Sequence, residues 1–144
     1  MKDYTQMPQM KLELVPLGVS DVDRAKDFYT KAGFKPEVDV EPVKGMRVVQ
    51  FTPPGSGCSI VFGTGMQDIS DIKPGSAVGL HLVVDNIDEA RQALLENGIE
   101  VQEISDMQGV KYASFNDPDG NNWLLQMFPA ELRSPGQSFY KGGK

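Results

Sequence analysis

The chain repeats part of itself at a fixed offset of 65 residues. The segment 19–25 (Val-Ser-Asp-Val-Asp-Arg-Ala) returns as 84–90 (Val-Asp-Asn-Ile-Asp-Glu-Ala), and Gly33 returns as Gly98. A constant offset of this size is typical of two copies of one supersecondary unit. The 144 residues are therefore expected to fold as two equivalent halves, in which each residue can be compared with its counterpart.

Each half is expected to be a β-α-β-β-β unit. In the first, apolar and β-rich runs predict strands over 12–19, 34–40, 46–51 and 58–62, with a helix from the N-cap Asp21 to Ala32. In the second, the same patterns predict strands over 80–84, 99–104, 111–115 and 122–128, with a helix over 87–97 capped by Asn86. Gly33 and Gly98 end the helices as residues that tolerate a positive φ.

The organisation expected from these elements is one domain built from two units. It divides into a flexible lead-in (1–10), a first βαβββ unit (11–63), a connector (64–77), a second βαβββ unit (78–128) and a C-terminal tail (129–144). A chain of this length can bury most of its apolar surface around one core or two small ones.

The charge and composition exclude several classes of function. A net charge of −6 is the opposite of the clustered Lys and Arg that nucleic-acid partners require. No apolar run approaches the roughly 18 residues of a membrane span, and the N-terminus lacks the apolar core of a signal peptide. The single cysteine, Cys58, cannot form an internal disulfide, so a cytoplasmic location is expected.

Two motifs connect the chain to a known family. The turn 115–121 (Phe-Asn-Asp-Pro-Asp-Gly-Asn) and the Val-x-Asp-x-x-x-Ala opening of each helix resemble the vicinal-oxygen-chelate superfamily, which includes glyoxalase I, extradiol dioxygenases and bleomycin-resistance proteins. The resemblance covers residues 11 to about 128. It implies an α+β fold in which both units curl into a half-open, barrel-like sheet with the helices outside. Because such units expose sheet edges, it also implies a homodimer.

The resemblance also predicts where a metal would be held. Enzymes of the superfamily bind a divalent ion through His, Glu or Gln on the first and last strand of each unit. Those positions correspond here to Leu14, Gly79, Leu124 and either Ser59 or Ile60. None of these residues supplies the imidazole nitrogen or anionic oxygen that such an ion needs, so no metal and no cofactor are expected.

The same positions predict an apolar cup. Because strand residues two apart share a face, His81 is expected beside Gly79, and Gln126 beside Leu124. Sparse polar groups in an apolar concave surface are typical of a small-molecule pocket. The predicted ligand-binding residues are His81, Gln126, Leu14, Gly79, Leu124, Ser59, Tyr112 and Arg47.

Three functions remain open from the sequence. The first is a protein that binds a small organic molecule without a metal, as the bleomycin-resistance-like members of the superfamily do. The second is a metal-independent enzyme, of lyase or isomerase type, with His81 as general acid or base. The third is an assembly domain whose cup is filled by a neighbouring chain. A further alternative is that the inward-facing side chains of the strands form a packed core and leave no pocket.

Overall fold

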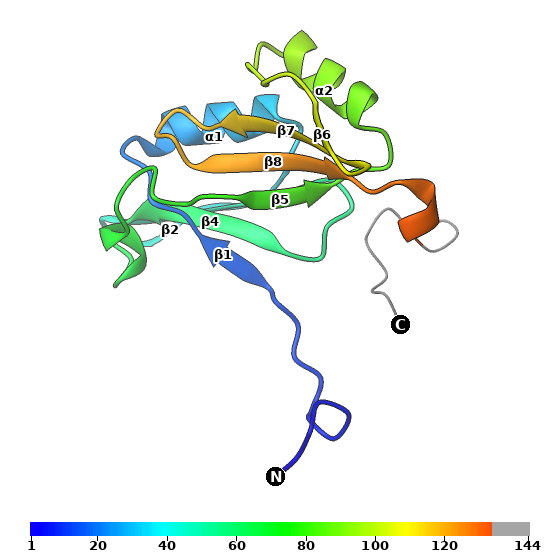
Figure 1. Cartoon of the computed structure of the whole chain (residues 1–144). Helices are drawn as coiled ribbons and strands as arrows, with labels where there is room; N and C mark the ends of the chain where they lie inside the picture. The colour runs from blue at the N-terminus through cyan, green and yellow to red at the C-terminus, as the bar shows by residue number, and fades with distance from the viewer. Residues whose placement is uncertain (134–144) are drawn as a thin grey trace.

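The computed structural model describes residues 1–133 and contains the β-α-β-β-β unit twice (Figure 1). The first unit consists of β1 (Leu14–Pro16), α1 (Val22–Lys31), β2 (Lys35–Val43), β3 (Met46–Thr52) and β4 (Ser59–Thr64). The second consists of β5 (Leu80–Val83), α2 (Ile87–Glu96), β6 (Ser105–Met107), β7 (Val110–Asn116) and β8 (Asn122–Met127). A 3-10 turn follows each unit, at Ile69–Asp71 and Ala130–Leu132; the rest of the predicted tail, 134–144, lies outside the described residues.

Each helix begins at its predicted cap and ends one residue before its predicted end, at Lys31 and Glu96. The side chain of Asp21 accepts a hydrogen bond from the Arg24 amide, and the side chain of Asn86 accepts one from the Glu89 amide, each at 3.0 Å. Both caps satisfy an amide that the first helical turn would otherwise leave unpaired. Neither α-helix within residues 1–133 has the length and apolar character that crossing a bilayer requires.

The strands form two separate four-stranded sheets that do not close into a barrel. Their orders are β1-β4-β3-β2 and β5-β8-β7-β6. In each sheet the first strand runs parallel to the last strand of its own unit, and the other neighbours are antiparallel. β1 and β5 therefore each have one free edge. The α+β fold of two curled units is confirmed.

One predicted strand is wrong. The structure has no strand over 99–104, and β6 begins only at Ser105. The apolar alternation there comes from Ile99 and Val101, which point into the core from a loop. The carbonyl of Val101 accepts a hydrogen bond from the guanidinium of Arg91 on α2 at 3.1 Å. The Gln102 amide donates to the Ser114 carbonyl of β7 at 2.8 Å, so the segment keeps one backbone contact with that strand without forming a strand itself.

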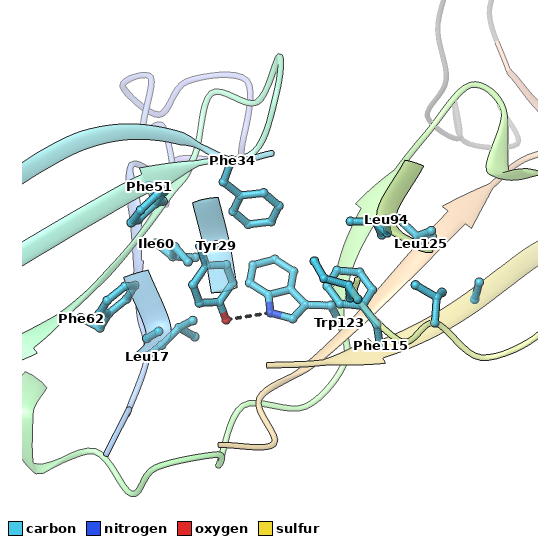
Figure 2. Close-up of a cluster of buried hydrophobic side chains, with 14 of the residues drawn as sticks. Leu17, Tyr29, Phe34, Phe51, Ile60, Phe62, Leu94, Phe115, Trp123 and Leu125 are labelled. Atoms are coloured by element: carbon cyan, nitrogen blue, oxygen red, sulfur yellow. Dashed lines mark hydrogen bonds between the residues drawn. The ribbon is translucent and has the colours of Figure 1, made fainter. Parts of the chain in front are cut away.

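The two units share one hydrophobic core that lies between the sheets. Figure 2 shows Tyr29 of α1 with Phe51 and Phe62 of the first sheet on one side and Trp123 of the second sheet on the other. Trp123 is 3% exposed and so belongs to this core. Since one face of each sheet is directed at this common core, the opposite faces, here called the open faces, point away from it and from each other.

A buried carboxylate links the units across this core. Asp117, in the β7–β8 turn, is 4% exposed and accepts a hydrogen bond from the Tyr29 hydroxyl at 2.7 Å. The Tyr29 oxygen in turn accepts one from Trp123 Nε1 at 3.1 Å (Figure 2). Burial, followed by the charge of Asp117, raises the pKa of Tyr29, so its hydroxyl remains a donor. We call these three residues the clamp.

The rest of the β7–β8 turn strengthens the same junction. Asp119 accepts hydrogen bonds from the amide and the hydroxyl of Ser20, and the Asn121 side chain donates to the carbonyl of Gly18 at 2.9 Å. The turn thus reaches the loop between β1 and α1, about a hundred residues earlier in the chain. The motif at residues 115–121 therefore forms the β7–β8 turn and also holds the second unit against the first.

Candidate functional site: the open face of the second sheet

Five of the predicted ligand-binding residues gather on one open face. The register pairs His81 with Leu124, and Tyr112 with Gln126, so these four side chains lie on the same side of the second sheet. Gly79 immediately precedes β5 and lies two residues before His81. A β-carbon added at Gly79 would meet only the His81 ring, at 4.0 Å, so the missing side chain leaves space beside that ring.

The polar groups on this face are oriented by contacts among themselves. His81 Nδ1 lies 2.7 Å from the Gly79 carbonyl oxygen; because a carbonyl can only accept, Nδ1 carries the proton. In the neutral ring Nε2 is then an acceptor. The His81 and Tyr112 rings meet edge to face, with centroids 6.1 Å apart, and the Gln126 amide donates to the Tyr112 hydroxyl at 3.2 Å. The face offers a ligand one imidazole acceptor and one phenol beside the apolar side chain of Leu124, and it also carries the polar residues Ser114 and Asn122.

The alternation of the strands adds residues that sequence reasoning missed, among them Val83 and Ser114. Val83 follows His81 by two positions and is 39% exposed, and Ser114 follows Tyr112 by two. Both therefore lie on the open face, where Ser114 pairs with Leu124. The period-two pattern of β5 and β7 was the signal that could have identified them.

The remaining predicted residues of the first sheet lie elsewhere. Leu14 pairs with Ser59 and both face the open side of the first sheet. The Ser59 hydroxyl is hydrogen-bonded to that of Thr52 at 2.6 Å and is nearly buried. Because the open faces point away from the shared core, one chain does not bring Leu14 and Ser59 together with His81. Within one chain these predicted residues therefore lie on two separate faces.

The sequence left Ser59 and Ile60 as alternatives for the counterpart of Leu124 in the first unit, and the strand pairing supports neither. His81 pairs with Leu124, and its counterpart Pro16 pairs with Val61, so Val61 corresponds to Leu124 at an offset of 63. Ile60 lies on the opposite face, in the core. The offset falls from 65 to 63 because the first unit is longer by two residues. One lies between Gly33 and Phe51, whose counterpart is Phe115, and the other lies in the β3–β4 turn, across which Phe51 and Ile60 pair nine positions apart whereas Phe115 and Trp123 pair eight apart.

Arg47 does not line an open face, contrary to expectation. It shares a face of β3 with the core residue Val49, and its guanidinium bonds to Asp39 through Nε at 3.0 Å and to Asp23 of α1 through Nη1 at 2.7 Å. Lys26 also contacts Asp39. Hydrogen bonds from Arg47 and then Lys26 lower the pKa of Asp39 to about 2. Arg47 therefore fixes α1 to the first sheet.

This ion cluster predicts acid sensitivity. Because the pKa of Asp39 is about 2 in the fold and about 4 in an unfolded chain, its contribution to stability is present above pH 4 and is lost as the pH falls towards 2. Asp39→Asn should reduce the loss of stability between pH 5 and pH 2.5, measured as the shift in urea midpoint. Glu41→Gln, on the same strand but without an ion pair within residues 1–133, should keep the wild-type pH dependence. An unchanged profile for Asp39→Asn would contradict the assignment.

The donor set does not fit the metal that the fold family uses. With the register resolved, the corresponding positions hold Leu14, Gly79, Leu124 and Val61, none of which has a ligating atom in its side chain. Within residues 1–133, no three His, Cys, Asp or Glu side chains are grouped closely enough to hold an ion. Of the nearby open-face residues, His81 is the one strong transition-metal ligand.

A second concave feature lies between the units. This inter-unit groove has a volume of about 820 Å³ and is bounded by the end of α1, the β3–β4 turn, α2 and the stretch His81–Asp85. Its apolar wall includes Phe34, Leu82, Leu94 and Leu125. Sequence reasoning missed the groove because its walls come from both units and depend on how these pack together.

Comparison with known proteins gives one family. The sequence profile of the family described as Glyoxalase/Bleomycin resistance protein/Dioxygenase superfamily matches residues 11–125. Among curated proteins, none matches the chain.

Solved structures with similar folds include three that are more than 30% identical. The antibiotic-binding protein TnmS3 from Streptomyces sp. CB03234 is 32% identical with a TM-score of 0.73, over 87% of this chain and 100% of that one. A glyoxalase/bleomycin resistance protein from the same organism is 34% identical with a TM-score of 0.68, over 81% and 100%. A superfamily member from Sphaerobacter thermophilus is 31% identical with a TM-score of 0.69, over 82% and 97%.

Proposed function

Because the chain belongs to the glyoxalase/bleomycin resistance protein/dioxygenase superfamily, we propose that it binds a small organic molecule, of the antibiotic class, on the open face of the second sheet and without a metal. The observation that carries the proposal is the arrangement of His81 and Tyr112 beside the space left at Gly79. Polar groups of fixed orientation beside an open space are typical of a ligand site. The printed description of TnmS3 as antibiotic-binding supports the ligand class.

The site is proposed to be completed by a second copy of the chain. An open sheet face alone is too flat to surround a ligand, whereas ligand sites bury most of the surface of what they bind. The free edges of β1 and β5 can pair between two chains, which would place the first sheet of one chain beside the second sheet of the other. Leu14 and Ser59 would then face His81 and Leu124 across the chain boundary. The predicted cup is thus proposed as a feature of the homodimer.

The absence of a metal is proposed from the chemistry of the residues. Leu14, Gly79, Leu124 and Val61 stand where the family's enzymes have ligands, and His81 with the neutral amide of Gln126 lacks the anionic donor that tight sites usually include. The contacts of His81 are the Gly79 carbonyl and the Tyr112 ring, and neither supplies the carboxylate that commonly orients and activates a catalytic imidazole. Binding is therefore proposed in preference to metal-independent catalysis by His81.

The proposal predicts a specific response to mutation of His81. Removal of the Nε2 acceptor and of the ring's contact with Tyr112 is expected to weaken ligand binding about tenfold, since a hydrogen bond contributes about 1 kcal/mol and the ring adds contact area. The measurement is calorimetric titration of wild type and His81→Ala with a panel of aromatic and glycopeptide antibiotics, including metal-free bleomycin. Binding should be the same after treatment with a chelator.

The control is Asp106→Asn, which changes a polar side chain on the opposite face of the outer strand β6 of the same sheet, because Asp106 pairs with Lys111 and not with Tyr112. It should bind like wild type. Product formation that His81→Ala abolishes would replace the binding function by the enzymatic one. Binding lost on chelation would exclude the metal-free site, and failure of the whole panel to bind would contradict the proposed ligand class.

A further inference from the structure

The N-terminal arm, residues 1–12, carries large apolar side chains that the fold leaves in water. The exposed fractions are 122% for Met1, 90% for Tyr4, 75% for Met10 and 71% for Leu12. Figure 1 shows the arm leaving the body on the side opposite to α2. Its side-chain hydrogen bonds join only residues 3, 5 and 6 to one another. Contiguous exposed apolar side chains of this kind mark an interaction surface.

The spacing of these side chains suits an extended segment that contacts a partner along one side. Met1, Tyr4, Met7 and Met10 are each three positions apart. An extended chain with three residues per turn places Met7 and Met10 in one row, and Pro8 favours this conformation over a helix. Tyr4 lies in a turn, closed by the hydrogen bond from the Gln6 amide to the Asp3 carbonyl oxygen at 3.1 Å, and from this turn its exposed ring adds to the apolar surface of the arm. The long, unbranched methionine side chains adapt to irregular apolar surfaces. The arm can thus present an apolar row to a groove.

The inter-unit groove is an unfilled apolar surface of matching character. It offers about 820 Å³ bounded by apolar residues such as Phe34, Leu82 and Leu94. The arm of the same chain does not enter it. The Ser59 amide donates a hydrogen bond to the Glu13 carbonyl at 2.9 Å, which holds the base of the arm in line with β1. From this base the arm runs away from α2, one wall of the groove (Figure 1).

We propose that in a homodimer the arm of each chain packs into the inter-unit groove of the other chain. This inference depends on the dimer invoked for the proposed function. In an antiparallel pairing of the free edges, the start of β1 lies beside the end of the partner's β5. The stretch His81–Asp85 that ends β5 is itself a wall of the groove. The arm continues β1 backwards and therefore enters the groove at that point.

Symmetry makes the arrangement complete at two chains. Each chain supplies one arm and one groove, so a two-fold dimer fills both grooves and leaves no further arm to recruit a third chain. The family match begins at residue 11, so nearly all of the arm lies outside the segment shared with the family. The contact is accordingly inferred for this chain from its own residues.

The first test compares two triple variants of the full chain. Tyr4→Ser/Met7→Ser/Met10→Ser removes the apolar row, and Lys2→Ser/Gln6→Ser/Gln9→Ser is the matched control on the same arm. Sedimentation velocity gives the dimer dissociation constant. Intrinsic fluorescence reports on the groove, since the only tryptophan, Trp123, contacts the groove residues Phe34 and Phe115 at ring distances of 5.3 and 6.3 Å.

The apolar-row variant should have a dissociation constant at least tenfold higher than wild type and a changed Trp123 emission at concentrations where wild type is dimeric. The control should match wild type in both. If the apolar-row variant dimerises like wild type with unchanged emission, the arm contact is excluded while the dimer stands. A wild type that is monomeric at about 10–100 μM would exclude both the dimer and the arm contact. Ligand binding is measured separately by calorimetry, so its result does not depend on this outcome.

A cross-linking experiment distinguishes the partner's arm from the chain's own. In a Cys58→Ser background, one chain carries Gln9→Cys and a second, mass-tagged chain carries Ala93→Cys, a residue of the groove wall. A disulfide between the two chains after mixing supports exchange of the arms. A disulfide formed within one chain that carries both cysteines, with none between chains, would show that the arm occupies its own groove and would overturn the proposal.

Discussion

Asp117→Ala should lower the free energy of unfolding by about 3–5 kcal/mol, because it leaves several buried donors without an acceptor. The two carboxylate oxygens accept from the Tyr29 hydroxyl at 2.7 Å, from the Asn121 amide and side chain at 2.9 and 2.8 Å, and from the Asp119 amide at 2.9 Å. Each orphaned donor costs about 1–3 kcal/mol, although losses within one network do not add fully. Urea denaturation followed by Trp123 fluorescence measures the change.

The control for Asp117→Ala is the same substitution at Asp106. Its side chain accepts from the Gly109 amide at 2.8 Å in the exposed β6–β7 turn, so water can replace it. Asp106→Ala should cost about 1 kcal/mol or less. Equal losses for the two variants would show that the clamp contributes no more than an ordinary turn contact.

Gly75→Ala is expected to destabilise the protein by about 3–4 kcal/mol. Gly75 has a φ of +76°, and an added β-carbon would lie 2.0 Å from the Asp119 carbonyl oxygen, a distance that forces the backbone to move. The left-handed conformation alone costs an alanine about 1–2 kcal/mol, and displacement of packed atoms costs about 1–3 kcal/mol more. The displaced atoms belong to the turn that holds the units together, so thermal and urea unfolding should both register the change.

Gly55→Ala separates the two contributions. Gly55 also has a φ of +76°, but a β-carbon there would meet nothing within 4 Å. The substitution should therefore cost only the conformational part, about 1–2 kcal/mol. The difference between the two variants measures the steric part, and no difference would mean that the turn can shift without loss.

Sequence reasoning predicted the parts of the fold that depend on local signals. The caps at Asp21 and Asn86 and the repeat itself specify the helices and the order of the strands. It failed over 99–104, where an apolar alternation that resembles a strand belongs to a loop held by Arg91. Period-two patterns report which side chains are buried, and a loop that crosses a core buries side chains in the same way.

The candidate site was predictable within one sheet and not between sheets. His81, Tyr112 and Gln126 share a face because strand alternation is a local property. Whether they share a cup with Leu14 depends on how two units pack, and that is set by the contact of Tyr29 with Trp123. Arg47 was misplaced because its strand register was unknown, and a shift of one residue moves a side chain to the other face.

The clamp also makes the two halves of this repeat unequal. The offset of 65 places Leu94 at the counterpart of Tyr29, and strand pairing places Ile60 at the counterpart of Trp123. Neither can donate or accept a side-chain hydrogen bond, so two copies of the first half could not reproduce this junction. The first unit therefore supplies the Tyr29 hydroxyl and the second supplies Asp117 and Trp123, so neither unit can replace the other at this junction.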